Sequence, residues 1–386
     1  MKLIHLSDLH LGKQVNGFSM IDDQKHILKE ILRVIDEEAP DAVLIAGDIY
    51  DKPLPAVEAV KLLDSFLSAL MNRRLPVFLI SGNHDSAERL AFGSGIMKNE
   101  GLYIAPAYDG TVRPVTLQDA WGEVRIYMLP FIKPVHMRAV LRSMDREQEE
   151  IDAVVSYTDA VRAAIREMHI DPAARNVLIT HQFITGADTS DSEERTVGGA
   201  DNVDAAVFRD FDYVALGHIH RPQYVERETV RYCGTPLKYS FSEAGHEKSV
   251  TVAELGNKGE FSWRAVPLVP LHDMREIRGT YDELTLKQNY ENTETEDYVH
   301  VTLTDEEEIL EAVARMRTIY PNLMRLDYDN QRTRASDELQ AAEETEQKTP
   351  LELFGELFEM QNGKMMTMRQ MQYAGRVIEE VWEEEQ

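Results

Sequence analysis

Five short polar fragments, each placed directly after an apolar run, constrain this chain more than any other feature. They are Asp8-Leu-His10, Gly47-Asp48, Gly82-Asn83-His84-Asp85, Thr180-His181 and Gly217-His218-Ile-His220. Together they offer carboxylate, amide and imidazole groups but no thiol, which is typical of Mn, Fe or Zn sites. Two divalent ions about 3.5–4 Å apart need such a set, including one carboxylate that both ions share. The pattern therefore predicts a two-metal centre of the kind that hydrolyses phosphoesters.

The apolar runs before these fragments predict the fold class. They are short, continuous and rich in β-branched residues, as buried strands are, and they cover residues 3–6, 42–46, 77–80, 177–179 and 213–216. Helical patterns lie between them, for example over 54–71. This alternation predicts an α/β fold with a largely parallel sheet and covering helices. Ligands bind at the carboxyl ends of strands in such folds, and all five fragments lie there.

The pattern changes from about residue 230. Residues 248–255 and 261–265, joined by the turn Gly256-Asn-Lys-Gly259, are predicted to form a hairpin. We expect it to introduce a second, more antiparallel sheet, so that residues 1–270 form a two-sheet β-sandwich core flanked by helices. Residues 271–332 then alternate strand, helix, strand, helix and strand, which predicts a small α+β capping domain. Its second helix carries Ile309, Val313 and Met316 and ends before Pro321.

The last part of the chain is predicted to be a helical tail. Residues 333–348 are polar and weakly patterned, which indicates a linker. In residues 349–386, Thr349 and Pro350 begin one helix and Asn362-Gly363 ends it. A second helix has one apolar stripe, made of Met371, Ala374, Ile378, Val381 and Trp382. The two helices either fold back on the main body or dock onto a partner.

The composition restricts the class of function and the cellular compartment that we expect for this chain. A net charge of −27 counts against an autonomous nucleic-acid binder, because such affinity comes mostly from Lys and Arg. The acidic residues are concentrated in places such as 291–311, which has no Lys or Arg. Cys233 is the only cysteine, which excludes an internal disulfide. With no candidate leader or membrane span, we expect a cytoplasmic protein.

The donor types suggest how two ions are shared. We expect Asp48 to bridge them, since a carboxylate has two oxygens. One ion is predicted to take Asp8, His10, Asp48 and His220; the other is predicted to take Asp48, Asn83, His181 and His218. His84 is expected to contact the phosphate or protonate the leaving alkoxide, with Asp85 orienting it. Cys233 and the other histidines, such as His5, are expected to be structural.

These fragments resemble the calcineurin-like metallophosphoesterases. Narrower strings resemble the SbcD family, the nuclease subunits of bacterial SbcCD complexes. They are Ser7-Asp-Leu-His-Leu-Gly-Lys13, Gly47-Asp-Ile-Tyr-Asp51, Ser192-Glu-Glu-Arg195 with Gly198-Gly199, and Tyr232-Cys-Gly-Thr-Pro236. The resemblance extends over essentially the whole chain, including the cap, linker and terminal helices.

This resemblance implies a specific activity and specific partners. The expected enzyme is a Mn²⁺-dependent, ATP-assisted 3′–5′ exonuclease on double-stranded DNA ends that also opens hairpins, acting in repair, recombination and replication at the nucleoid. It implies a nuclease homodimer within a heterotetramer with the SbcC ATPase, whose coiled-coil base binds the terminal helices. Positive residues near the motifs are either DNA contacts or ordinary surface residues; they are Lys13, Arg89, Lys133 and Arg221.

Two other functions are compatible with parts of the pattern. One is a metallophosphodiesterase for a small nucleotide or another non-DNA phosphodiester, which would need neither cap nor docking helices. The other is a scaffold with a vestigial metal site, which the complete set of seven donors argues against. The helix predicted over 54–71 either forms the dimer surface or simply covers the sheet.

Overall fold

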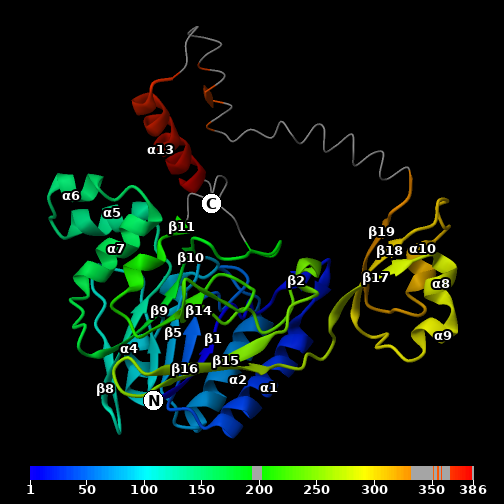
Figure 1. The fold of residues 1–386 in the computed structure, drawn as a ribbon, viewed down its shortest axis with the longest axis horizontal. Coiled ribbons are helices and arrows are strands. Elements are labelled where there is room, and N and C mark those ends of the chain that lie inside the picture. Colours follow the sequence, from blue (N-terminus) through cyan, green and yellow to red (C-terminus); the bar gives the residue numbers. More distant parts are fainter. Residues whose placement is uncertain (194–201, 332–350, 352–353, 356–357, 359–365, 385–386) are drawn as a thin grey trace.

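Two six-stranded sheets face each other in the centre of the molecule (Figure 1). The computed structural model describes residues 1–193, 202–331, 351, 354, 355, 358 and 366–384. The first sheet has the order β16 (Phe261–Pro267), β15 (Ser249–Leu255), β1 (Lys2–Leu6), β4 (Ala42–Ala46), β5 (Val77–Ile80) and β6 (Leu102–Ile104). The second has the order β13 (Gln223–Val225), β14 (Arg227–Tyr232), β12 (Tyr213–Gly217), β9 (Arg175–His181), β8 (Gly122–Leu129) and β7 (Val115–Asp119).

The sandwich is confirmed, but its sheets are assembled differently from the prediction. The β15–β16 hairpin forms as expected, yet it extends the first sheet, because β15 pairs antiparallel with β1. The second sheet comes from earlier residues, and its central strands β8, β9, β12 and β14 run parallel. Strands β9 and β12 therefore lie in a different sheet from β1, β4 and β5. The five predicted strands are continuous apolar runs in both sheets, so sequence patterning could not tell which sheet each one joins.

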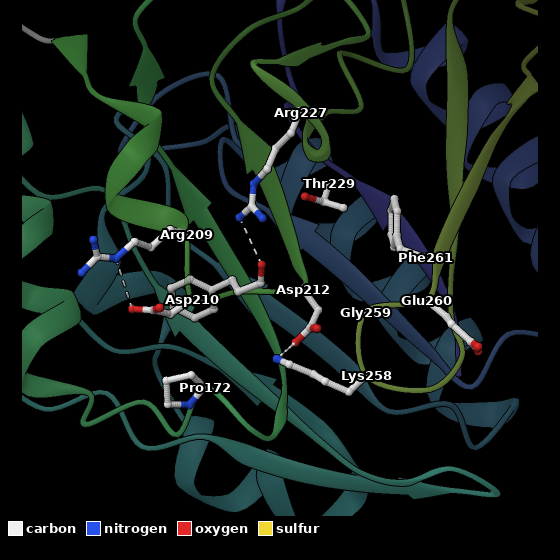
Figure 2. A pocket seen from close by; sticks show the side chains of 11 residues that line it. Pro172, Arg209, Asp210, Asp212, Arg227, Thr229, Lys258, Gly259, Glu260 and Phe261 are labelled. Carbon is white, nitrogen blue, oxygen red and sulfur yellow. Dashed lines mark hydrogen bonds and ion pairs between the residues drawn. The ribbon is translucent and has the colours of Figure 1, made fainter.

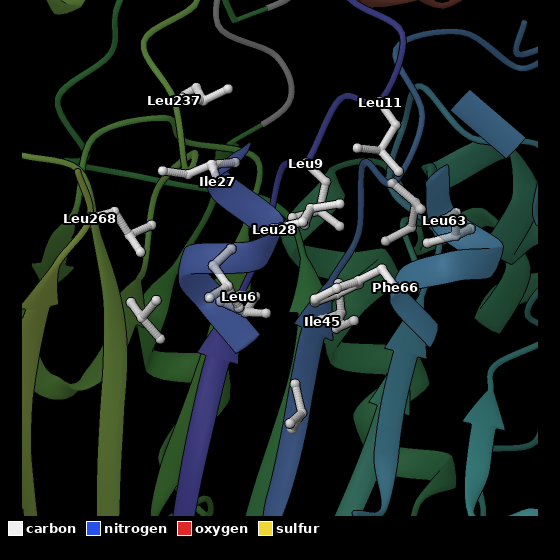
Figure 3. Packing of buried hydrophobic residues seen from close by; sticks show 14 of the residues in the cluster. Leu6, Leu9, Leu11, Ile27, Leu28, Ile45, Leu63, Phe66, Leu237 and Leu268 are labelled. Carbon is white, nitrogen blue, oxygen red and sulfur yellow. The ribbon is translucent and has the colours of Figure 1, made fainter. Parts of the chain in front are cut away.

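Helices cover the outer face of each sheet and make this a four-layer fold. On the first sheet, α1 (Ile21–Glu38) and α2 (Val57–Asn72) pack with residues such as Ile27 and Phe66 onto Leu6 and Ile45, as Figure 3 shows. On the second, α5 (Pro134–Ser143), α6 (Gln148–Asp152) and α7 (Tyr157–Glu167) contribute to a separate apolar cluster. A third cluster, which includes Leu44 and Val177, fills the space between the sheets.

Short elements connect these layers. They are β2 (Gln14–Val15), β3 (Phe18–Ser19), α3 (Ala87–Leu90), α4 (Ser94–Met97), β10 (Phe183–Ile184) and β11 (Asn202–Val203), with 3-10 turns at Lys98–Glu100, Ala205–Phe208 and Phe241–Glu243.

His5 is structural, as predicted. It lies on β1 with no exposure, and its Nδ1 is 2.7 Å from the Tyr213 hydroxyl on β12. Burial first, then the charge of Arg231, lowers the pKa of His5 to about 3, so a neutral imidazole joins the two sheets.

The cap is a three-stranded parallel sheet in the order β17 (Met274–Gly279), β18 (Tyr298–Leu303) and β19 (Leu323–Tyr328). Its helices are α8 (Tyr281–Thr285), α9 (Lys287–Tyr290) and α10 (Ala312–Met316). The strands match the prediction. The second helix is shorter than expected, because Glu311, just before α10, adopts a left-handed φ of 54°. Ile309 thus precedes the helix, although it still packs on the apolar cluster of the cap.

The C-terminal region is described only in part. The predicted linker over 333–348 and most of the first predicted helix lie outside the described residues. The second helix is α13 (Met368–Glu384), and on it Ala374 is buried whereas Met371 is 46% exposed. The fold class is thus confirmed, while the limits of the domains stay a prediction. Among the helices that the structure describes, none has the length and apolar character needed to span a bilayer.

Candidate metal centre

The predicted donors meet where strands of both sheets end. Asp8 and His10 follow β1, and Asp48 follows β4; all three have left-handed backbones, with φ of 53°, 43° and 48°. The amide of Asp8 donates to the Gly47 carbonyl, and that of His10 donates to the Asp48 carbonyl, each at 3.0 Å. These bonds hold the two loops side by side. A left-handed backbone is unfavourable in free energy for residues other than glycine. These three conformations therefore indicate a site whose backbone is held by the surrounding structure.

Two glycines of the fragments are required by close packing. A Cβ on Gly82 would lie 2.1 Å from Asp48 Oδ1, and one on Gly217 would lie 1.8 Å from the Ala46 carbonyl oxygen. Neither position has room for a side chain. The glycines next to the donors therefore allow the loops after β4, β5 and β12 to approach each other.

One group of donors gathers around His10. Its Nε2 is 3.1 Å from His220 Nε2 and 3.7 Å from Asp48 Oδ2. Asp8, His10 and His220 each offer a donor atom within 4.8 Å of the others', and all three are buried. These are the residues expected to share one ion with Asp48.

The second group gathers around His181. Its Nε2 is 3.3 Å from Asp48 Oδ2 and 3.0 Å from Asn83 Oδ1. Asn83 Oδ1 is also 2.9 Å from His218 Nδ1. Asp48 thus belongs to both groups, as a bridging carboxylate should. The structure brings all seven predicted donors together. Asp8 is also within reach of the His181 group, because its Oδ1 lies 4.0 Å from His181 Nδ1, so the division between the two ions stays a prediction.

The chemistry of these groups fits a pair of divalent cations. Burial is the main cause that lowers the pKa of His10 well below its ordinary value and that of His218 to about 3, so both imidazoles keep a lone pair for coordination. Cys233 does not join them: burial raises the pKa of its thiol, and its Sγ lies 3.1 Å from Ser7 Oγ. A donor set of oxygen and imidazole nitrogen suits Mn, Fe or Zn.

The carboxylates depend on their imidazole neighbours. Burial raises the pKa of Asp8 to about 6. Burial would also raise the pKa of Asp48, but the charge and hydrogen bond of His181, with the charges of His84 and His10, hold that pKa well below its ordinary value. For His181, burial acts to lower the pKa, yet Asp48 raises it to about 9. A bound cation would replace this proton, because metal binding at such a site releases protons.

Asp85 has a different place from the one expected. Instead of orienting the His84 ring, its carboxylate accepts hydrogen bonds from the amides of Ile49, Tyr50 and Gly82 at 2.9–3.0 Å. It therefore fixes the backbone next to Asp48. His84 Nδ1–H donates to the Asp51 carbonyl at 3.1 Å, and its Nε2 lies 3.9 Å from Asp48 Oδ2. His84 thus stands at the edge of both donor groups, with 13% of its side chain exposed.

Sequence reasoning missed a buried support for the His10 loop. Gln24, on α1, donates through Nε2 to the His10 carbonyl at 2.8 Å and accepts from the Gly12 amide at 2.9 Å. The Tyr239 hydroxyl donates to the Leu9 carbonyl at 2.7 Å. Because Gln24 and Tyr239 are 215 residues apart, no local pattern could have indicated their shared role.

The four candidate DNA contacts occupy different environments. Lys13 pairs with Asp51 at 2.7 Å, with only 15% of its side chain exposed, and Arg221 pairs with Asp188 at 2.9 Å. Arg89 is exposed on α3, and Lys133 is partly buried just before α5. A role in DNA contact stays a prediction for each. Of the SbcD-like strings, Glu194, Arg195 and Gly198-Gly199 lie outside the described residues.

A cavity of about 290 Å³ lies apart from the donors, among residues such as Arg209, Asp212, Arg227, Lys258 and Phe261. Figure 2 shows its cationic side chains turned toward protein acceptors. Lys258 donates to Asp212 at 2.7 Å, and Arg227 donates to the Phe208 carbonyl at 2.6 Å. Both cationic groups are thus paired with protein acceptors. The cluster of metal donors is therefore a better candidate for the active site than this cavity.

Comparison with known proteins agrees with the geometry. The calcineurin-like phosphoesterase family matches residues 1–222, and the family described as type 5 capsule protein repressor C-terminal domain matches 270–362. The SbcD component of the SbcCD nuclease from Staphylococcus epidermidis is 34% identical over 330 residues, which cover 84% of this chain and 85% of that protein.

Solved structures are more distant. A dimetal phosphatase from Danio rerio is 11% identical with a TM-score of 0.40, covering 70% of this chain and 98% of its own. The phosphoesterase Yfce of E. coli is 12% identical with a TM-score of 0.27, covering 69% of this chain and 100% of its own. On the strength of the sequence matches, the chain belongs to the calcineurin-like phosphoesterase family and, within it, to the SbcD family.

Proposed function

We propose that this chain is the metal-dependent nuclease subunit of an SbcCD-type complex and hydrolyses phosphodiesters of DNA with two ions, which we take to be Mn²⁺. One observation carries the proposal: the seven donors converge at one place, where Asp48 lies next to both His10 and His181. Family membership and the absence of sulfur from the donor set support it. When bound, the ions would lower the pKa of a water molecule and offset charge on the phosphate.

His84 is proposed to act on the substrate. Since its Nδ1–H donates to the Asp51 carbonyl, Nε2 is directed toward the donor groups, where Asp48 Oδ2 lies 3.9 Å away. The His84 imidazolium would donate from Nε2 to a phosphate oxygen, or give its proton to the leaving alkoxide. Asp85 supports the site by accepting hydrogen bonds from the Ile49 and Tyr50 amides, which fixes the backbone next to Asp48. The proposed hydrolysis needs no covalent phospho-enzyme.

The substrate and partners are proposed from the family and the domain order. The substrates are double-stranded DNA ends, degraded 3′ to 5′, and hairpins, cut with assistance from ATP hydrolysis by the SbcC partner. Residues 1–270 would form the nuclease domain, 271–332 the cap, and 349–386, after the linker, the helices that dock on SbcC. We place this activity in DNA repair, recombination and replication, in the cytoplasm at the nucleoid. Lys13, Arg89, Lys133 and Arg221 are the proposed DNA contacts.

The homodimer within the heterotetramer has a candidate surface. Leu54, just before α2, and Val57, its first residue, are 74% and 64% exposed. Phe92 and Ile96, in the α3–α4 region, are 83% and 78% exposed. Other residues of both regions, Leu63 and Leu90, pack on one apolar cluster. Exposed apolar side chains of this size favour a protein interface. Part of α2 covers the sheet, and its first turn offers the dimer surface.

The test is digestion of end-labelled duplex and hairpin DNA by the purified chain with Mn²⁺ or Mg²⁺, with and without SbcC and ATP. His84→Ala is expected to lower the cleavage rate about 10²–10⁴-fold while leaving Mn²⁺ binding intact. His169→Ala, which removes a histidine outside the donor groups, is the control. A wild-type chain that spares every DNA substrate but hydrolyses a small aryl phosphodiester would overturn the substrate assignment and favour the non-DNA alternative.

A further inference from the structure

A buried polar network surrounds His220 on the side away from the proposed ion. It consists of Ser192, Glu193, Thr235, Glu243 and Lys248, which come from the loop before β11 and from the segment between β14 and β15. Glu243 has no exposure, and the Lys248 side chain is 5% exposed. A buried ion pair carries a large desolvation cost, so its position beside one proposed ligand calls for a functional explanation.

The hydrogen bonds fix the tautomer of His220. Ser192 Oγ donates to Glu243 Oε1, since a carboxylate can only accept. The same Oγ lies 2.5 Å from His220 Nδ1, and with its hydroxyl proton already used it must accept there. Nδ1 of His220 therefore carries a proton. In a neutral imidazole this leaves the lone pair on Nε2, the atom 3.1 Å from His10 Nε2.

The backbone of His220 is held by the same network. Its amide donates to Glu193 Oε1 at 2.7 Å, and its carbonyl accepts from Lys248 Nζ at 2.9 Å. Lys248 also donates to Thr235 Oγ1 at 2.7 Å and to Glu243 Oε2. All three ammonium protons are thus used, and ring, amide and carbonyl of His220 are each restrained.

We propose that Ser192 and the Glu243–Lys248 ion pair are positioning residues for the ion that His10 and His220 share, acting as a serine-mediated relay that keeps His220 Nε2 unprotonated and aimed at it. This deepens the proposed function and rests on it for the presence of the ions. Partners that orient a ligand histidine typically change metal affinity about 10–100-fold when removed. The relay also gives Ser192-Glu193, which belong to one of the SbcD-like strings, a physical role.

The experiment measures binding of Mn²⁺ alone to the full chain by titration calorimetry and electron paramagnetic resonance. Ser192→Ala removes the relay while leaving the ion pair intact, and it is expected to weaken one of two binding events about 10–100-fold. Ser192→Thr keeps the hydroxyl and is expected to restore affinity. Asn83→Ala identifies the other event, because Asn83 Oδ1 is within hydrogen-bond distance of His181 and His218.

Two further variants separate positioning from general stability. Glu243→Gln with Lys248→Met removes both charges together, since either change alone would leave a buried charge unpaired; it is expected to weaken the same event as Ser192→Ala. Ser143→Ala, an exposed serine on α5, is the control and should bind as wild type. Unchanged binding in Ser192→Ala would overturn the proposal, and so would equal weakening of both events, which would indicate general loosening.

Failure of this inference and failure of the proposed function are distinguishable. If the wild type binds Mn²⁺ and the relay variants lose one event, but no DNA is cut, the positioning role stands and the nuclease assignment fails. If the wild type cuts DNA and Ser192→Ala binds Mn²⁺ normally, the nuclease assignment stands and the positioning role fails.

Discussion

His10 and His220 face each other with their Nε2 atoms 3.1 Å apart, although 210 residues separate them in the chain. Without a metal ion, this distance fits a hydrogen bond in which a neutral His10 donates Nε2–H to the lone pair of His220 Nε2. Burial lowers the pKa of His10 well below its ordinary value, so the neutral form of this ring is favoured. A cation held by both Nε2 atoms would replace this hydrogen bond, with the His10 proton moved to Nδ1.

Metal removal is therefore expected to destabilise the fold. A ligand that binds only the folded state stabilises it by about 2.7 kcal/mol at one hundred times its dissociation constant. The melting temperature of the chain should rise with Mn²⁺ and fall with EDTA, as measured by calorimetry. His220→Ala should shrink this difference, because it removes a donor from one group. Equal melting temperatures with Mn²⁺ and with EDTA would count against the site.

A methyl group at position 82 is expected to damage the centre. In Gly82→Ala the new Cβ would lie 2.1 Å from Asp48 Oδ1, so the shared carboxylate has to move. We expect a loss of about 1–3 kcal/mol of folding free energy together with Mn²⁺ affinity at least tenfold lower in calorimetric titration. Gly95→Ala, where nothing lies within 4 Å of the added Cβ, is the matched control. Similar affinities for both variants would contradict this account of Gly82.

The cap is anchored to the core by a buried carboxylate. Tyr298 on β18 donates its hydroxyl to Asp23 Oδ2 on α1 at 2.7 Å, and the His272 amide donates to Asp23 Oδ1 at 3.2 Å. Tyr298→Phe is expected to cost about 0.5–3 kcal/mol and to speed hydrogen exchange where the cap meets α1. Tyr320→Phe breaks a bond to the Leu284 carbonyl inside the cap and should leave exchange in α1 unchanged. If both variants exchange alike in α1, the anchor is not at Asp23.

An ion pair at the opposite end of the strands predicts a pH dependence of stability. Arg175 donates to both oxygens of Asp119, at 2.5 and 3.0 Å, and these bonds are the main cause that holds the pKa of Asp119 well below its ordinary value. A depressed carboxyl pKa gives stability that is fully present above the unfolded-state value of about 3.9 and lost as the pH falls below it.

The measurement compares melting temperatures of the wild type and Asp119→Asn from about pH 7 to about pH 2.5, a range that spans the unfolded-state pKa. At neutral pH the variant is expected to be less stable by about 1.5–3 kcal/mol. The difference should stay constant down to about pH 5 and narrow below about pH 4. Glu88→Gln, on the exposed part of α3, controls for the loss of a negative charge. A gap that is independent of pH would show that Asp119 contributes by packing rather than by charge.

The sequence by itself determined five strands of the core, over 3–6, 42–46, 77–80, 177–179 and 213–216, and the polar residues that follow them. Each of these five is a continuous apolar run, and a polar fragment directly after such a run must emerge at the end of the strand. For the same reason the sequence predicted that the polar residues after these strands would gather at the carboxyl edge of the sheet. They are Asp8, Asp48, Asn83, His181 and His218. Chemical type then suggested that Asp48 is shared, since a carboxylate offers two oxygens.

Only the tertiary structure decided how these parts combine. It placed β9 and β12 in a second sheet and the β15–β16 hairpin in the first, because pairing between buried strands depends on long-range packing that runs of similar composition do not encode. It turned Asp85 toward backbone amides and brought Glu243 and Lys248 behind His220. Such hydrogen bonds join residues far apart in the chain, and they form only where the fold removes water and leaves polar groups that must find partners.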